Sequence, residues 1–334
     1  MACNFQKMVE KVVKMREKSR MGIDNKKGKN YNKGKGGTDM ETVLQTFELT
    51  KKFGRKTALD RVSLTVQQGD IYGFIGGNGA GKTTLMRLAL NLAFPTAGRV
   101  ALFGGESFAT AGRRIGSLIE APAFYRGLSA KENLLAFGAL VGADPKQADC
   151  LLERVGLSDT GKKKAGSFSL GMKQRLGLAI ALLGQPELII LDEPVNGLDP
   201  AGIRDVRDLI LEYNREKGVT FLISSHLLDE LSKIATRYGI LNQGRLVDEI
   251  SAADLFERTR HRLRITVDDP QKALRILDMA DVRVEGDILT LLSGFESPAL
   301  LNRKLVEGGV AVSGLTVLSD GLEQYFVERI GGEQ

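Results

Sequence analysis

The segment from Gly76 to Thr83 is the part of the sequence whose residue types are most clearly suited to chemistry. Its glycines allow successive backbone N–H groups to turn inward around phosphate oxygens, because no Cβ stands in the way. The apolar run Ile71–Ile75 predicts a strand before it and Leu85–Leu92 predicts a helix after it, which is the context of a phosphate-binding loop. The helix would direct its positive end at the same phosphates. The alternative, a glycine-rich turn with an unrelated lysine, leaves the flanking strand and helix unexplained.

Two side chains at the end of this loop are expected to act on a bound nucleotide. Lys82 is expected to reach the β- and γ-phosphates, and the hydroxyl of Thr83 is expected to bind Mg²⁺. The residues expected to contact the nucleotide here are Gly76, Gly77, Asn78, Gly79, Ala80, Gly81, Lys82, Thr83 and Thr84.

A second candidate site is the pair of acids that follows the apolar run Leu188–Leu191. A buried strand that ends in carboxylates delivers them to the edge of a parallel sheet. Asp192 would hold the magnesium, directly or through its water, and Glu193 would accept a proton from the attacking water as general base. The alternative is a strand that simply ends in solvated acids, and the phosphate-binding pattern upstream counts against it.

The elements around these residues alternate between strand and helix. Val62–Val66 alternates like a half-buried strand, and Val219–Ser224 predicts another buried strand. Before the latter lies a helix that Asp199 can cap, that has Pro200 at its first position, and that Gly218 ends. Such strand–helix–strand units imply a parallel sheet covered on both faces.

Two further local patterns lie between the candidate sites. Ser129 and Glu132 form the pattern of a capping box before the apolar helix Leu134–Val141. Cys150 is expected on the apolar face of a helix around Leu151, and with only one other cysteine in the chain no disulfide framework is expected.

The region from about Glu41 to Asp248 resembles the ATP-hydrolysing subunit of ABC transporters. The phosphate-binding loop and the Asp192–Glu193 pair match that family, and further motifs follow in the family's order and spacing. Phe168–Arg175 is similar to the signature segment, and Asn196–Asp199 is similar to the loop after the catalytic acid. His226 matches the switch histidine, and Phe53 matches the aromatic residue that stacks on adenine. The alternatives are a structural histidine and a plain core aromatic.

The resemblance implies that two chains share each catalytic site. Ser169 heads a predicted helix over Leu170–Leu183, so its hydroxyl, the N–H groups of the first turn and Gly171 would form an anion site. In this family two chains meet head to tail, and each closes its signature helix over the γ-phosphate held by the other. The alternative for Ser169 is an ordinary helix cap.

Several positions depart from the usual family pattern. Leu170 stands where the family has a second glycine, and Met172 where it has a glutamine. Glu120 stands where the family has a glutamine that touches magnesium or the attacking water, and it keeps an oxygen directed at the metal while adding charge. These departures, with the stretch Ala121–Tyr125, are similar to the bacitracin-export and lantibiotic-immunity branch.

The chain's charge is concentrated at its N-terminus. The 334 residues carry a net charge of +6, but residues 1–40 hold eleven Lys or Arg and four acids, which leaves −1 for residues 41–334. Residues 1–40 are therefore expected to be a basic, disordered arm without chemistry, although a contact with lipid or nucleic acid is an alternative. No secretory signal and no apolar run near the ~20 residues of a membrane span are found.

The sequence therefore predicts an α/β P-loop ATPase domain over residues 41–248, with a helical insertion over about 109–184, and a small α+β accessory domain over residues 249–334. The resemblance implies ATP and Mg²⁺ as cofactors, a homodimer or paired ATPase subunits, and a separate transmembrane permease. It also implies a peripheral place on the cytoplasmic face of the cell membrane, export or clearance of a peptide antibiotic, and no nucleic acid. A soluble ABC-type ATPase acting on ribosomes or nucleic acid is the alternative; a GTPase or kinase would leave the Ser169 segment unexplained.

Overall fold

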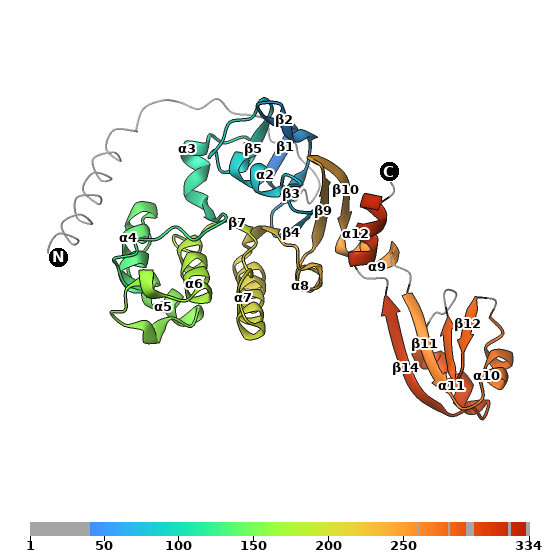
Figure 1. Cartoon of the computed structure of the whole chain (residues 1–334). Coiled ribbons are helices and arrows are strands. Elements are labelled where there is room, and N and C mark those ends of the chain that lie inside the picture. The colour runs from blue at the N-terminus through green and yellow to red at the C-terminus, as the bar shows by residue number, and fades with distance from the viewer. Residues whose placement is uncertain (1–40, 259–260, 280, 292–296, 320–321, 332–334) are drawn as a thin grey trace. The chain divides into compact units, whose positions relative to one another are not determined.

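The computed structural model describes residues 41–258, 261–279, 281–291, 297–319 and 322–331, and the chain divides into two units, residues 1–249 and 250–334 (Figure 1). The division lies next to the boundary expected after Asp248. The expected basic arm, residues 1–40, lies outside the described residues. Within the described residues, no helix has both the length and the apolar character that a membrane crossing needs.

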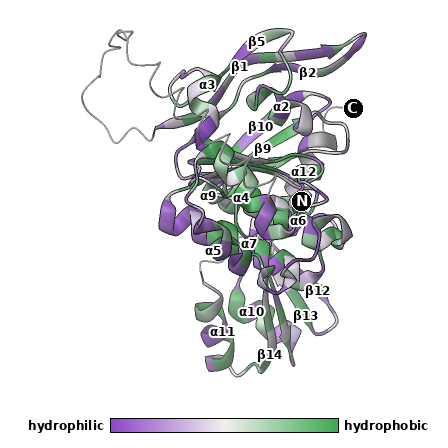
Figure 2. Ribbon diagram, turned by 90° about the vertical axis from the view of Figure 1, so that its left-hand side faces the viewer, coloured by the Kyte–Doolittle hydropathy of each residue, from purple (hydrophilic) through white to green (hydrophobic). Residues whose placement is uncertain are grey.

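A six-stranded sheet forms the centre of the first unit, in the strand order β10-β9-β4-β8-β7-β6. Strands β9, β4, β8, β7 and β6 run parallel to one another, as expected from the sequence. Every residue of β4, β7 and β8 is buried, which explains their continuous apolar runs. In Figure 2 the strand labelled β9 has the hydrophobic colour. The bounds are β4 Ile71–Ile75, β6 Ile115–Leu118, β7 Leu188–Asp192, β8 Thr220–Ser224, β9 Arg237–Asn242 and β10 Arg245–Ser251.

Helices cover both faces of this sheet. Helix α2 (Lys82–Ala89) packs on the face that carries Tyr72 and Phe74. Helices α7 (Pro200–Lys217) and α8 (Leu228–Ser232) lie on the opposite face, where a Cβ on Gly73 would come within 2.8 Å of Leu231. The strand β4 can lie this close to α8 only because its central residue is glycine.

Helix α7 is built as the sequence predicts. The Asp199 side chain accepts a hydrogen bond from the Gly202 N–H at 3.0 Å, Pro200 is its first residue, and Gly218 ends it at φ 64°. Helix α2 begins three residues earlier than predicted, at Lys82, and ends at Ala89 rather than Leu92 because the chain turns at Asn91, where φ is 54°.

An antiparallel sheet that the sequence analysis did not anticipate packs on the other side of α2. Its strands are β1 (Thr42–Phe53), β2 (Lys56–Val62), β3 (Thr65–Gln67) and β5 (Ala97–Leu102), and the last three all pair with β1. Helix α2 is thus enclosed by apolar residues of both sheets. This arrangement fixes the direction in which the helix presents its first turn.

The prediction of one strand over Val62–Val66 is wrong, because the chain leaves the sheet at Ser63 and Leu64, between β2 and β3. The buried side chain of Thr46 bridges the break: its hydroxyl donates to the Val62 carbonyl at 2.9 Å and accepts from the Leu64 N–H at 3.0 Å. The Thr46 hydroxyl therefore replaces backbone hydrogen bonds between strands at this point. The alternation of apolar residues within Val62–Val66 could not predict the break, because Thr46 lies outside that segment.

The region between β5 and β7 contains a group of helices (Figure 1). Its elements are α3 (Phe108–Ala111), α4 (Ala130–Val141), α5 (Gln147–Arg154) and α6 (Leu170–Ala181). The expected helical insertion over about 109–184 begins too early, because β6 lies inside that range and pairs with β7 in the parallel sheet. Gly116 of β6 lets α6 pack closely on this strand, since a Cβ there would lie 1.9 Å from the carbonyl oxygen of Ala181 in α6.

Two local expectations in this region have different outcomes. The capping box at α4 is confirmed: Glu132 N–H donates to Ser129 Oγ at 3.2 Å, and Ser129 N–H donates to Glu132 Oε2 at 2.6 Å. The second bond lowers the pKa of the Glu132 carboxyl. The expected burial of Cys150 is wrong, because this cysteine is exposed and the buried residues of α5 are Ala148, Leu151 and Leu152.

The second unit is an antiparallel sheet in the order β12-β13-β11-β14, with α10 and α11 on one face. Side chains at alternate positions of β11, Leu263 and Ile265, are buried with Ala273 of α10 and Leu305 of α11. This is the α+β arrangement expected. The bounds are α9 Ala252–Arg258, β11 His261–Val267, α10 Pro270–Leu277, β12 Val282–Glu285, β13 Ile288–Leu291, α11 Pro298–Glu307, β14 Val312–Ser319 and α12 Leu322–Gly331.

Replacing Thr46 by valine should destabilise the first unit. The variant keeps the side-chain shape but leaves the Val62 carbonyl and the Leu64 N–H without their hydroxyl partner, at a cost of about 1–3 kcal/mol. Urea unfolding measures this change, and Thr57→Val at an exposed position of β2 is the control. Equal stability of both variants would contradict the bridging role of Thr46.

Candidate functional site

A cleft of about 360 Å³ lies at the carboxyl ends of β4 and β7, where the phosphate-binding loop follows one strand and the two acids end the other. The structure thus brings together most of the nucleotide-binding residues expected from the sequence. Lys56 and Ala58 of β2 line the cleft as well, and the sequence analysis missed them because nothing in their types marks them. The lining is Phe53, Lys56, Ala58, Asn78, Gly79, Ala80, Gly81, Lys82, Thr83, Thr84, Asp192 and Glu193.

Glycine is required at two positions of the loop. Gly81 has φ of 111°, and a Cβ there would lie 2.6 Å from the Ala58 carbonyl oxygen. A Cβ on Gly76 would lie 2.6 Å from the Leu241 carbonyl oxygen. The loop is therefore held between β2 and the end of β9, and any larger residue would displace it from the start of α2.

Lys82 carries a buried positive charge that is held by the loop itself. Its side-chain Nζ donates hydrogen bonds to the carbonyl oxygens of Gly76 at 2.7 Å and Gly77 at 3.3 Å. Among the described residues, no carboxylate forms a salt bridge with it. A buried ammonium group held only by carbonyl dipoles favours an anion beside it, so the cleft suits a polyphosphate.

Thr83 and Asp192 place two oxygen ligands side by side. The Thr83 hydroxyl donates to Asp192 Oδ2 at 2.7 Å, and Asp192 is only 3% exposed. In the part of the chain that the structure describes, no cluster of three or more His, Cys, Asp or Glu residues could hold a metal alone. One carboxylate and one hydroxyl beside a phosphate cradle fit Mg²⁺, which is held by few protein ligands together with substrate phosphates.

Glu193 is fixed in direction by its neighbours. His226 Nδ1 lies 2.6 Å from Glu193 Oε2, and the His226 N–H donates to the same oxygen at 3.3 Å. Glu193 has φ of 51°, a left-handed conformation that costs a residue with a side chain about 1–3 kcal/mol. The buried Gln174 of α6 helps to hold it there, because its Nε2 donates to the carbonyl oxygens of Glu193 and Pro194 at 3.4 and 3.0 Å.

Phe53 lies at the end of β1, with 54% of its surface exposed and on the edge of the cleft. The Lys51 ammonium lies 4.9 Å from the centre of the ring. The interpretation of Phe53 as a plain core aromatic is therefore wrong. An exposed ring beside a phosphate cradle leaves one face for a nucleotide base, and adenine stacking stays a prediction.

Ser169 and Gly171 are not part of the cleft of their own chain. Ser169 is exposed at the start of α6, and its hydroxyl accepts from the Met172 N–H at 3.2 Å. A Cβ on Gly171 would lie 3.2 Å from Leu198 in the loop after the acids, and one on Gly197 would lie 2.4 Å from Leu170. The signature helix and this loop thus form one packed surface. The expected contact of Ser169 with a phosphate held by a second chain stays a prediction.

Glu120 does not line the cleft in this structure. It follows β6 with φ of 57°, and its Oε1 accepts from Arg87 of α2 at 2.7 Å. The ion pair satisfies the charge that distinguishes this residue from the glutamine of the family pattern. The expected contact with magnesium therefore stays a prediction, and it requires this pair to open.

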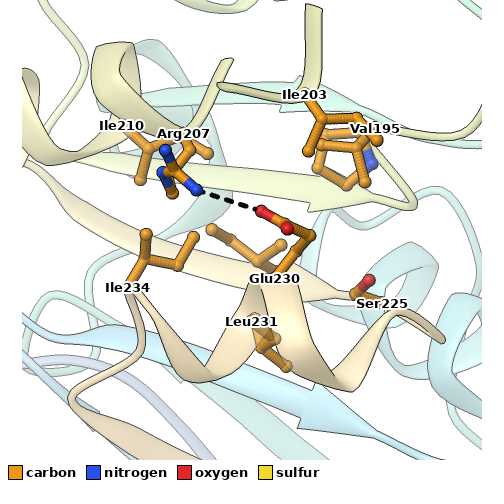
Figure 3. Close-up of a pocket in the computed structure, with 10 residues that line it drawn as sticks. Val195, Ile203, Arg207, Ile210, Ser225, Glu230, Leu231 and Ile234 are labelled. Atoms are coloured by element: carbon orange, nitrogen blue, oxygen red, sulfur yellow. Dashed lines mark hydrogen bonds and ion pairs between the residues drawn. The ribbon is translucent and has the colours of Figure 1, made fainter. Parts of the chain in front are cut away.

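A small apolar cavity of about 20 Å³ lies between α7, α8 and the residues that follow the two acids (Figure 3). It has room for one water at most. Its wall includes Pro194 and Val195, which directly follow Glu193. Arg207 of α7 and Glu230 of α8 form an ion pair across it at 3.3 Å. The cavity is part of the framework of the site and is too small for a ligand.

Comparison with known proteins points to one family. The sequence profile described as ABC transporter matches residues 59–196. The bacitracin transport ATP-binding protein BcrA of Bacillus licheniformis is 45% identical over 302 residues, which cover 88% of this chain and 99% of that protein. The lantibiotic transport ATP-binding protein SrtF of Streptococcus pyogenes is 41% identical over 62% of this chain and 90% of its own.

Solved structures agree with these sequence matches. The ATP binding subunit of an ABC transporter is 27% identical, with a TM-score of 0.60 over 65% of this chain and 93% of its own. A dimeric ATP-binding cassette in a post-hydrolysis state, bound to ADP and Pi, is 26% identical, with a TM-score of 0.57 over 63% of this chain and 98% of its own. The resemblance inferred from the motifs and the expected α/β P-loop fold are thus confirmed.

Lys82→Ala should weaken ATP binding itself, because the variant removes the cation that faces the phosphates. The loss of a charged hydrogen-bonding partner corresponds to about tenfold or more in affinity. Isothermal titration with ATP measures it, and Lys131→Ala on the surface of α4 is the control. Unchanged affinity in Lys82→Ala would remove the phosphate-binding role from this loop.

Glu193→Gln should bind ATP and hydrolyse it at least ~100-fold more slowly, because the amide cannot accept the proton of the attacking water. The variant should also accumulate as an ATP-bound dimer on size-exclusion chromatography. Glu187→Gln, just before the other end of β7, is the matched control and should retain turnover. Turnover at the wild-type rate in Glu193→Gln would exclude Glu193 as the base.

Proposed function

The chain belongs to the ABC transporter family of ATP-binding proteins, and we propose that the ATP it hydrolyses powers a separate permease that exports or clears a peptide antibiotic of the bacitracin or lantibiotic type. The observation that carries this proposal is the single cleft where Lys82 and Thr83 meet Asp192 and Glu193. The match of nearly the whole chain to a bacitracin transport ATP-binding protein supports the proposed substrate class.

The proposed reaction follows from the positions of these groups. Lys82 exchanges the two carbonyl oxygens of its own loop for phosphate oxygens of ATP. Thr83 and Asp192 would hold Mg²⁺, which would supply charge neutralisation at the β- and γ-phosphates. The water oxygen attacks the γ-phosphorus while Glu193 takes a proton from that water. The bond between the γ-phosphorus and the β,γ-bridging oxygen breaks, which releases ADP and inorganic phosphate. His226, beside Glu193, orients the carboxylate and the γ-phosphate.

Two copies of the chain are proposed to meet head to tail. Ser169 and Gly171 lie outside the cleft of their own chain, so a second copy is needed to bring them to a γ-phosphate. The dimeric cassette among the solved relatives supports this arrangement. ATP binding would close the dimer and hydrolysis would open it, and this alternation would drive the permease between its two states.

The permease is proposed to hold the chain at the cytoplasmic face of the cell membrane, with contacts near Glu120 and the helices that follow it. No nucleic acid is part of this proposal. The alternative, an ABC-type ATPase that acts on ribosomes or nucleic acid, is not favoured, since the relatives named above are transport proteins and the charge of residues 41–334 is only −1.

Expression in a bacitracin-sensitive bacterium tests this proposal. The chain together with its permease should raise the inhibitory concentration of bacitracin or a lantibiotic severalfold, whereas either protein alone should not. Glu193→Gln with the same permease is the control and should give no protection. Co-sedimentation with ribosomes, with no protection by the complete pair, would favour the alternative.

A further inference from the structure

Ser224, the last residue of β8, lies between the two acids of the cleft. It is fully buried and stands directly opposite Asp192 in the parallel pairing of β7 and β8. Its hydroxyl donates to Asp192 Oδ1 at 2.6 Å, and its Oγ accepts from the Glu193 N–H at 3.0 Å. A serine hydroxyl has one proton, which the bond to Asp192 uses, and a lone pair of the same oxygen accepts the Glu193 N–H, so the two bonds together define the orientation of the hydroxyl.

The first of these bonds fixes the rotation of the Asp192 carboxylate. One oxygen, Oδ1, is held by Ser224, and the other, Oδ2, is held by Thr83 at 2.7 Å. Without Ser224, the carboxylate could rotate about its Cβ–Cγ bond. The hydroxyl therefore helps Thr83 to fix the plane of the carboxylate relative to the start of α2.

The second bond fixes the backbone of Glu193. The Glu193 N–H also donates to the Ser224 carbonyl oxygen at 3.2 Å, so the hydroxyl and the carbonyl group of one serine both hold this N–H. Glu193 needs such restraint, because its φ of 51° is unfavourable for a residue with a side chain. In this backbone conformation its carboxylate oxygen Oε2 lies 2.6 Å from His226 Nδ1.

We propose that Ser224 is a positioning residue for ATP hydrolysis. It fixes the position of the Asp192 carboxylate, which would hold the metal, relative to the Glu193 carboxylate, which would accept the proton. Ser224 is not among the residues that line the cleft, and it acts through these two residues. This inference rests on the proposed reaction, and it adds a residue that links the metal side of the cleft to the proton-accepting side.

Three variants test the proposal in the full-length chain. Ser224→Ala should lower kcat by about 10- to 100-fold, with KM for ATP nearly unchanged, since the phosphate contacts of Lys82 remain. It should also require more Mg²⁺ for half-maximal rate. Ser224→Thr keeps the hydroxyl and should restore most of the rate. Thr220→Val is the matched control, because Thr220 is equally buried at the other end of β8, where its hydroxyl accepts from the Gly69 N–H.

Amide hydrogen exchange without nucleotide gives a readout that does not depend on turnover. The Glu193 amide should be protected in the wild-type chain, and its exchange should accelerate about tenfold or more in Ser224→Ala but not in Thr220→Val. Rapid exchange of this amide in the wild-type chain would overturn the proposal, even if a Ser224 variant failed to fold.

The remaining outcomes separate this inference from the proposed function. Wild-type hydrolysis with an unaffected Ser224→Ala variant would overturn the role of Ser224 and leave the ATPase assignment intact. An equal loss in Ser224→Ala and Ser224→Thr, with both folded, would also overturn it. A wild-type chain that binds ATP without hydrolysing it, even with its permease, would count against the proposed function instead.

Discussion

The burial of three parallel strands on both faces is the constraint on which the cleft depends. Strands β4, β7 and β8 contain no exposed residue, so polar side chains can stand only at their ends or just beyond them. Parallel pairing then gathers those ends at one edge. Polar groups therefore meet at this edge because the rest of each strand is buried among apolar residues. They are the loop after β4, the acids at the end of β7 and the serine at the end of β8.

Helix α2 fixes the position of the phosphate-binding loop, because the loop ends at the first residue of this helix. It lies between the parallel and antiparallel sheets, with apolar residues of both around it, so its first turn has little freedom. Gly81 fits against β2, and Lys82 turns back onto the loop carbonyls. The antiparallel sheet thus shapes the cleft from the side opposite the acids, although only Phe53, Lys56 and Ala58 line it.

The sequence predicted those parts of the site that are encoded locally. Lys82, Thr83, Asp192 and Glu193 are recognisable because each stands at a fixed distance from an apolar strand or in a glycine-rich loop. The antiparallel sheet was not predicted, because β1 pairs with a strand as distant in the sequence as β5. The break bridged by Thr46 was not predicted either, because it depends on partners 16 and 18 residues away. The contact of Glu120 with Arg87, 33 residues earlier, was hidden for the same reason. Ser224 did carry a signal, a polar residue at the end of an apolar run, but its meaning required the register with Asp192.

At position 193 the backbone conformation favours glycine, whereas the proposed reaction needs a carboxylate. A glycine there would relieve the conformational cost and would still close the turn after β7, but it would have no carboxylate to offer. The turn would therefore be more stable without the residue that is proposed as the base. The residue that would best stabilise this turn and the residue that would carry out the proposed proton transfer are therefore different, and the chain has the second at a conformational cost.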